Sequence, residues 1–481
     1  MSGLMRKAAA AVLVFGLAWA GTIAYWRQTG STPGGMEMLA MLGLLPAGVL
    51  GGGWMLRGLA QRALDASANR ASSTDAAAPP AADVPAAADA SPPPRPLALL
   101  AASVRLPLGL EPAGLLADPL VLARPRAHPN YRDSSGLPIY LAMADDLDAS
   151  VLPAELDNEQ TEHIRRALAL LAPVAEDLLL QAAQALPAAA QSEGRVVAGW
   201  RRQVAEVVEH QLSIELLVPS AWSMALREAC ADWLRHSAQQ LGIDARRFDV
   251  QLLPADDAGE VWAHLRQRME ASAQATPGWQ LLLACHSTVG RASLERWEAS
   301  GRLRSPANSG GQVPGEAAAG VLLAWPAAQA VPWLRSVERA ELPDHSGVKA
   351  RTRCTGELAG ASLERAAVEP SRIDLVLSDA DLRADPAVEA SSAAHRVCVE
   401  LDLSRQYLAL STSSGEIGPV QPLAQLALAD AHLDAGGEAV MMLAVSPAST
   451  RWAAVLAPSS SPDQAGLDDV PAADAAQPEP V

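Results

Sequence analysis

The residues best able to do chemistry in this sequence are its thiols, its imidazoles and its clustered carboxylates. The four cysteines, Cys230, Cys285, Cys354 and Cys398, stand far apart and form no Cys-x-x-Cys pair. This spacing disfavours both a zinc site and a disulfide framework, and it is typical of reduced thiols in a cytosolic domain.

Cys285 and His286 are adjacent, which suggests a nucleophile and its base. They follow an apolar run, however, and adjacent residues of a β-strand point to opposite faces. We therefore expect a core thiol and a loop imidazole. Cys230 lies in an apolar helical stretch and is expected in the core as well, and acyl chemistry at either cysteine stays open as an alternative.

Asp379, Asp381 and Asp385 form an acidic cluster that could hold a divalent cation. We favour a solvated loop with a helix cap instead. The sequence contains no glycine-rich phosphate loop, no serine nucleophile elbow and no His-Glu-x-x-His motif. We therefore expect neither a metal nor a cofactor.

Composition narrows the class of protein. The 481 residues carry a formal net charge of −17, and 49% of them are hydrophobic while only 4% are aromatic. An acidic chain lacks the basic face that nucleic acids require, and it should not adhere broadly to anionic lipid. The length allows two ordinary domains or one large domain built of two parts.

Two apolar runs near the N-terminus, residues 8–26 and 38–56, are each long enough to cross a bilayer as a helix. Basic residues precede the first run at Arg6 and Lys7, and they follow the second run from Arg57 onward. The positive-inside rule then predicts a two-span hairpin in a bacterial inner membrane, with both termini and the folded body in the cytoplasm. A single anchor followed by a buried core helix is the alternative.

The domain boundaries follow from these patterns. The membrane hairpin takes residues 1–65. Residues 66–97 are rich in Ala, Pro, Asp and Ser, which is typical of a semi-extended linker. The folded body covers 98–457, and 458–481 form an acidic tail of disordered composition.

Strand-like and helix-like segments alternate within the body, which predicts an α/β layered sheet. The predicted strands are 213–219, 248–254, 278–286, 319–325, 372–379 and 450–458. The predicted helices are 155–186 (interrupted near Pro173), 221–242, 258–274, 292–300 and, as a buried helix or helix pair, 421–446.

The stretch 258–324 has the order helix, buried strand, short helix, Gly-rich loop, Gly-Glu and strand. Its signature starts at Gly315-Glu316, continues with three alanines and reaches Gly320. This resembles the thiolase-like fold, and within it the β-ketoacyl synthases, whose Gly-Glu-Gly-Ala-Gly signature opens a strand. The resemblance implies that Glu316 is a buried acceptor, which needs hydrogen-bond donors because an unpaired buried carboxylate is costly. A Glu on a surface turn is the alternative.

Two later stretches are also similar to the family. In 373–390 a strand runs into a loop, with Asp385 and Glu389 in the positions of the family's Asp and helix-opening Glu. Residues 428–445 resemble the small-residue buried helix near the family's end. The matches cover roughly 200–457, and they imply a five-layered αβαβα body.

The resemblance also implies which chemistry is missing. A β-ketoacyl synthase carries a Cys thiolate at the N-terminus of a buried helix, and His residues that stabilise the oxyanion. Placing 258–274 on that helix puts Asp256 and Asp257 at its start, where an Asp is a good cap and a poor acyl acceptor. Asp379 or a neighbouring residue falls at the position of the first His, and His432 stands near that of the last. These residues would form a degenerate site.

The expected function is therefore that of a pseudoenzyme: a non-catalytic, membrane-tethered scaffold or adaptor that binds a protein partner, with type VI secretion as one setting. One alternative is a non-catalytic partner subunit of a ketosynthase in lipid or polyketide synthesis. Another is an enzyme with displaced cysteine chemistry. Because the resembled family usually dimerises, a homodimer also stays open.

Overall fold

In the computed structural model the chain divides into two units, residues 1–90 and 91–481, and all described residues belong to the second. The described residues are 94–107, 112, 116, 125–145, 147, 162–187, 195–197, 200–202, 211–272, 278–325, 331–343 and 346–458. Both predicted membrane spans, most of the predicted linker and the tail after Pro458 lie outside them.

The second unit is built from two halves that repeat one strand arrangement. The first half contains β1 (Leu97–Arg105), β6 (Leu212–Val218), β7 (Phe248–Pro254), β8 (Gly278–Ser287) and β9 (Glu316–Trp325). The second half contains β10 (Pro332–Glu341), β11 (Leu375–Ser378), β12 (Tyr407–Ala409), β13 (Val440–Ala444) and β14 (Thr450–Pro458).

The strand orders are β7-β6-β8-β9-β1 in the first half and β12-β11-β13-β14-β10 in the second. In each half, three parallel strands are followed by two antiparallel ones. The halves meet where β1 pairs with β10, through Leu97↔Leu334 and Ala98↔Trp333. The fold is thus a duplication joined by a short seam.

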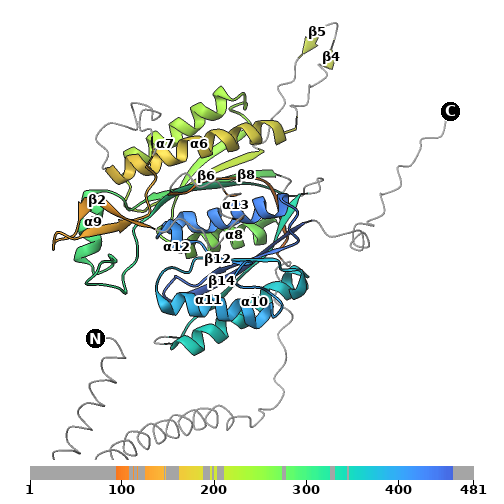
Figure 1. Ribbon diagram of the computed structural model, residues 1–481. Coiled ribbons are helices and arrows are strands. Elements are labelled where there is room, and N and C mark those ends of the chain that lie inside the picture. Colours follow the sequence, from red (N-terminus) through yellow and green to blue (C-terminus); the bar gives the residue numbers. More distant parts are fainter. Residues whose placement is uncertain are drawn as a thin grey trace, which may run out of the picture. The chain divides into compact units, whose positions relative to one another are not determined.

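Helices cover these sheets in layers (Figure 1). The outer helices are α6 (Glu162–Ala185) and α7 (Met224–Gln240) over the first half, and α10 (Val348–Ala366) and α11 (Ala384–Val397) over the second. Between the sheets lie α8 (Ala258–Ser272) and α13 (Gln421–Asp434), and their apolar residues share one core with strands of both halves. This αβαβα layering is the predicted architecture.

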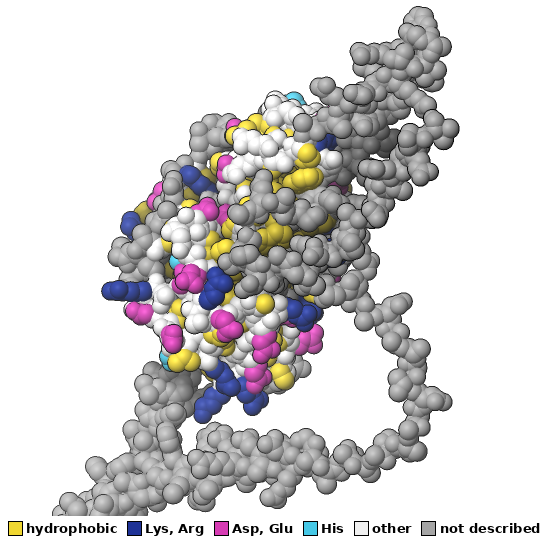
Figure 2. Space-filling view, turned by 90° about the vertical axis from the view of Figure 1, so that its right-hand side faces the viewer, with side chains coloured by type: hydrophobic (Ala, Val, Ile, Leu, Met, Phe, Trp, Pro, Cys, Tyr) yellow, Lys and Arg dark blue, Asp and Glu magenta, His cyan; other side chains and the backbone are white. Residues whose placement is uncertain are grey.

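Smaller elements complete the second unit. They are β2 (Arg126–Arg132), β3 (Pro138–Leu141), β4 (Arg195–Val197), β5 (Trp200–Arg202), α9 (Arg291–Ala299), α12 (Ser411–Ser414) and the short 3-10 helices Pro370–Arg372 and Gly418–Val420. Figure 2 shows one face of the protein, on which basic and acidic side chains are interspersed.

The prediction of a helix pair over 421–446 is wrong in its second part. The helix α13 ends at Asp434, Gly436 has a positive φ of 96°, and the apolar run after it forms β13. A glycine in this conformation ends a helix without steric cost. The run is five residues long, too short to distinguish a buried strand from a buried helix by periodicity.

Among the described residues, one helix, α6, is long and apolar enough to cross a membrane. Its apolar residues, from Ala167 to Ala182, pack in the outer core of the first half. In this structure α6 is therefore a core helix. The two predicted spans are not tested by it.

Candidate functional site

Two neighbouring cavities open where the parallel strands of each half end. The first cavity, of about 460 Å³, lies beyond the C-terminal ends of β6, β7 and β8. The second, of about 230 Å³, lies beyond β11, β12 and β13, at the start of α8 and α13. Arg302 and Glu416 line both cavities. Open α/β sheets bind ligands at such strand ends, which makes this region the candidate site.

The N-terminus of α8 separates the two cavities and is closed by its own side chains. Asp257 Oδ1 accepts a hydrogen bond from the Glu260 backbone N–H at 3.0 Å, and Glu260 Oε2 accepts one from the Asp256 N–H at 2.7 Å. This arrangement is a variant of the capping box, because Glu260 bonds the N–H of the residue before the cap rather than that of the cap itself. The carboxylate of Asp256 accepts from Ser220, through the backbone N–H at 2.8 Å and the hydroxyl at 2.5 Å. Both aspartates therefore stabilise the helix start.

His286, at the end of β8, forms part of the wall of the first cavity. Its Nε2 lies 4.0 Å from Glu416 Oε2, and its Nδ1 is buried with no hydrogen-bond partner among the described residues. Burial lowers the pKa of His286; the Glu416 carboxylate opposes this shift and Arg302 adds to it. Gly418, with φ +54°, packs against the ring, since an added Cβ would lie 3.2 Å from it. The imidazole is held in place by packing and is neutral at pH 7.

His286 was expected in a loop, but it lies on the strand, with only 17% of its side chain exposed. Cys285, the residue before it, packs into the outer core beneath α6 and α7. The two side chains thus face opposite sides of the sheet, as the strand geometry predicts.

Asp379 and Asp381 belong to the wall of the second cavity. Asp379 is 2% exposed and accepts hydrogen bonds from the backbone N–H groups of Val445 and Ser446. Its burial raises its pKa to about 6, although the two N–H groups act in the opposite direction. Asp381 is also buried and pairs with Arg383 at 2.8 Å. The expectation of a solvated acidic loop is therefore wrong for both residues.

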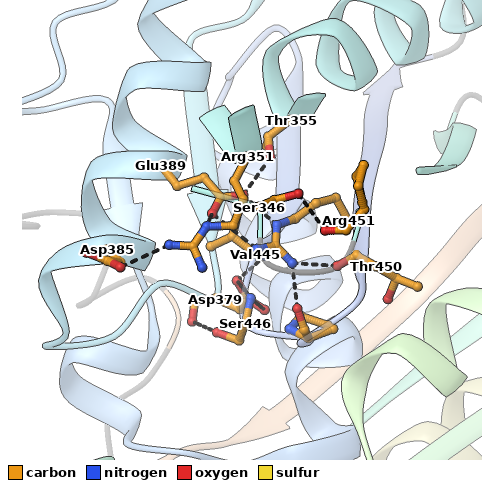
Figure 3. Close-up of polar contacts among 12 residues, drawn as sticks. Ser346, Arg351, Thr355, Asp379, Asp385, Glu389, Val445, Ser446, Thr450 and Arg451 are labelled. Carbon is orange, nitrogen blue, oxygen red and sulfur yellow. Dashed lines mark hydrogen bonds and ion pairs between the residues drawn. The ribbon is translucent and has the colours of Figure 1, made fainter. Parts of the chain in front are cut away.

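A partly buried ionic network lies next to this cavity (Figure 3). Glu389 of α11 pairs with Arg451 of β14 and accepts a hydrogen bond from Thr355 of α10 at 2.8 Å. Arg351 of α10 lies between Glu389, at 3.4 Å, and Asp385, at 3.0 Å. Asp385 lies in the first turn of α11 but is not its N-cap. The network ties three elements of the second half together.

Glu316 begins β9 and is fully buried. Its carboxylate pairs with the Arg166 guanidinium at 2.5 Å and accepts from the Ala144 N–H at 2.8 Å and the Ser287 hydroxyl at 2.9 Å. The surface-turn alternative is therefore wrong, and Glu316 is a structural acceptor that fixes α6 against the end of the sheet.

The two glycines of the signature permit close packing. A Cβ added to Gly315 would lie 2.1 Å from the Ser414 carbonyl oxygen, in the loop that carries Glu416. A Cβ added to Gly320 would lie 2.6 Å from methyl groups of Leu178 and Leu283. The first contact brings the two halves together at the site, and the second lets α6 lie close to the sheet.

The structure brings three of the four residues of the predicted degenerate site together. Asp256 lines the first cavity, and Asp257 and Asp379 line the second. His432 lies elsewhere, near the C-terminal end of α13, where its Nε2 is 2.9 Å from Asp374 Oδ1. The N-terminal end of α13, by contrast, reaches the second cavity, where Gln421 forms part of the wall. The Nε2 of Gln421 is buried and has no hydrogen-bond partner among the described residues.

None of the thiols lines either cavity. Cys230, Cys285 and Cys398 are buried, and burial raises the pKa of Cys230 to about 12 and that of Cys398 to about 11. The pKa of Cys285 is likewise raised by burial. Thiols in such surroundings are poor nucleophiles. Within the described ranges, no group of three or more His, Cys, Asp or Glu residues could hold a metal ion.

Sequence reasoning missed most of the first cavity. Its walls include His163 of α6, Arg296 of α9, Arg302 and Glu416. These residues come from three distant segments of the sequence, and no motif links them. The one available signal is the Gly-rich character of the loops before β9 and α13, which indicates close backbone approach but does not say which side chains meet there.

No protein-family model and no curated protein matches the chain. Solved structures do. A ketosynthase in complex with its type II polyketide acyl-carrier protein is 12% identical, with a TM-score of 0.51, over 76% of this chain and 99% of that one. The ketosynthase of module 6 of the Bacillus subtilis bacillaene synthase is 11% identical, with a TM-score of 0.50, over 76% and 72%.

The ishigamide ketosynthase/chain length factor is 16% identical over 76% of this chain and 100% of that one, with a TM-score of 0.45. The two matches with TM-scores of 0.51 and 0.50 establish the fold, and at 11–12% identity they establish nothing finer. The second unit of this chain has the thiolase-like fold of the ketosynthases.

Proposed function

We propose that this protein is a non-catalytic, thiolase-like scaffold that binds a protein partner at the cytoplasmic face of a bacterial inner membrane. The observation that carries the proposal is the start of α8. Asp257 caps this helix and Asp256 is held by Ser220, so the turn that faces both cavities presents carboxylates where a condensing enzyme needs a thiolate.

The buried cysteines support the same reading. A thiol with a raised pKa and no exposure cannot receive an acyl group from a soluble donor. Cys230 and Cys285 both lie in the outer core beneath α6 and α7, away from the two cavities. This argues against the alternative of displaced cysteine chemistry.

The membrane tether rests on the sequence. The apolar runs 8–26 and 38–56, with basic residues on their outer flanks, support a hairpin with both termini in the cytoplasm. No residue of the chain points to a type VI secretion machine as the partner. Type VI secretion is therefore proposed only as one cellular setting for the scaffold.

A second candidate is a non-catalytic subunit that works beside a ketosynthase in polyketide or lipid synthesis. One solved neighbour is a ketosynthase in complex with an acyl-carrier protein, so the fold can support recognition of a carrier. The sheet also ends at β7, and the structure describes no strand on its outer side. An open edge of seven residues could pair with a related subunit or with a second copy of this chain.

Affinity purification of the full-length chain from detergent extract tests both candidates. A scaffold co-purifies with one partner at a fixed ratio, and the mass of the complex in solution identifies a homodimer. Recovery of a ketosynthase or an acyl-carrier protein selects the second candidate.

A thiol-directed acyl probe tests for hidden chemistry. We expect no covalent labelling of the native chain at neutral pH. Rapid labelling that is lost in Cys285→Ala or Cys230→Ala would refute the non-catalytic proposal.

A further inference from the structure

We propose that the first cavity binds a small aromatic carboxylate. The inference does not require the scaffold function, because it concerns a ligand of the isolated chain. It rests on the walls of the cavity, on an unsatisfied imidazole within it and on two arginines at its mouth.

The walls of the cavity are partly aromatic and apolar. Trp222, after β6, and Trp297, in α9, both line it, together with Ile164 and Ala167 of α6. Indole faces favour offset or edge-on contact with another aromatic ring. A volume of about 460 Å³ lies in the range of pockets that enclose small organic ligands.

His286 lacks the partner that a buried imidazole needs. Its Nδ1 is buried and makes no hydrogen bond to any described residue, and its Nε2 is 4.0 Å from Glu416, beyond hydrogen-bond range. Buried polar groups in native proteins are nearly always paired. Because Nδ1 has no accessible surface, a ligand in the cavity would bond to the ring through Nε2, while Gly418 holds the ring in position.

The charged side chains of the cavity indicate which polar group the ligand carries. Arg296 is exposed, and its Nε donates to the Ala292 carbonyl of its own helix. The Arg302 guanidinium lies 4.4 Å from the Trp297 ring centre, so stacking orients it at the mouth. Two carboxylates, Asp256 and Glu416, also line the cavity, and their hydrogen bonds come from neutral donors, Ser220 and the Gly418 N–H. Neither arginine forms an ion pair with a described residue, so both guanidinium groups remain available to bind an acid in a bidentate manner.

The two histidines near the arginines do not add to this charge. Burial lowers the pKa of His163, and the neighbouring Arg296 and His286 add to the shift, while Glu162 opposes it. Burial lowers the pKa of His286 as well. Both imidazoles therefore favour their neutral form, and Arg296 and Arg302 supply the positive charge that a carboxylate would bind.

Isothermal titration of the full-length chain in detergent tests the proposal with three matched probes. They are 4-phenylbutyrate, its neutral amide 4-phenylbutyramide and the cation 4-phenylbutylamine. We expect the acid to bind with at least roughly tenfold higher affinity than the amide, because each charge-assisted hydrogen bond contributes on that scale. The amine should not bind measurably.

Variants locate the site. Arg296→Gln and Arg302→Gln should each weaken phenylbutyrate binding by about tenfold or more and leave amide binding unchanged. Arg291→Gln, an exposed arginine of the same helix that lines a different cavity, is the matched control and should bind the acid normally. His286→Leu should weaken both acid and amide.

Three outcomes overturn the proposal: no heat of binding for the acid at millimolar concentration, equal affinity for acid and amide, or preference for the amine. Each of these leaves co-purification of a protein partner unaffected. The failure of the ligand site and the failure of the scaffold function are therefore distinguishable.

Discussion

The buried pair of Glu316 and Arg166 gives the sharpest test of how the site is built. Glu316 has no exposed side-chain surface, whereas 19% of Arg166 is exposed. Removing either partner should therefore have unequal effects. Arg166→Met strands a carboxylate that keeps only the Ala144 N–H and the Ser287 hydroxyl as donors. Glu316→Gln leaves a guanidinium that can turn toward water.

The magnitudes follow from that asymmetry. Breaking a buried pair so that a charge stays behind costs about 3–5 kcal/mol, which is our expectation for Arg166→Met. Glu316→Gln retains an acceptor oxygen and should cost about 1–3 kcal/mol, the range for a lost hydrogen bond to a charged group. The double variant should be more stable than Arg166→Met alone, since the stranded charge is gone.

Urea unfolding of the full-length chain in detergent measures these differences. The matched control is Arg235→Met on α7, which removes an exposed pair with Asp232 and should cost under about 0.5 kcal/mol. The reasoning is refuted if Glu316→Gln is as costly as Arg166→Met, or if both stay within the control's range.

Three further predictions concern packing, pH and thiol access. Gly320→Ala should destabilise the protein by about 1–3 kcal/mol, because the added Cβ would meet two leucine side chains. Gly360→Ala, which places its Cβ in open space within α10, should stabilise the protein by up to about 1 kcal/mol. Thermal unfolding of the two variants measures the difference. Folding raises the pKa of Asp379 from 3.8 to about 6. This group therefore lowers the free energy of unfolding as the pH rises through that window, by up to about 3 kcal/mol. Asp379→Asn should reduce the slope of stability against pH in urea titrations at pH 4 to 7, where Asp430, with a pKa raised to about 7, still contributes; an unchanged slope would contradict the prediction. Iodoacetamide should modify the half-buried Cys354 first and Cys285 last in the native chain, and mass spectrometry of early time points that showed Cys285 ahead would disprove the burial argument.

The layered fold was predictable where the sequence carries long apolar runs between clear turns. The segments 248–254 and 450–458 are the strands β7 and β14 without change of bounds. The strand β1, by contrast, has the sequence LALLAASVR, in which alanine and leucine favour a helix. Its pairing with β9 and β10 decides its conformation, and such long-range contacts are not visible in a local pattern.

The site was predictable only in part, for a related reason. The position of Glu316 before a buried strand predicts that its carboxylate needs hydrogen-bond donors. The sequence does not predict that Arg166 supplies them. The cap of α8 follows from Asp257 and its neighbour Glu260. The meeting of His286 with Glu416 depends on how two halves of the chain are placed against each other, and no spacing within one segment encodes that.

The duplicated architecture also constrains how the chain can be cut. The inner sides of both sheets are covered by the same two helices, α8 and α13, whose residues pack against strands from each half. A fragment that ends between β9 and β10 would lack α13. The apolar inner side of its sheet would then be exposed to water, and the fragment would be prone to self-association. Each half therefore shields the apolar inner side of the other half from water. We expect neither half to fold stably on its own.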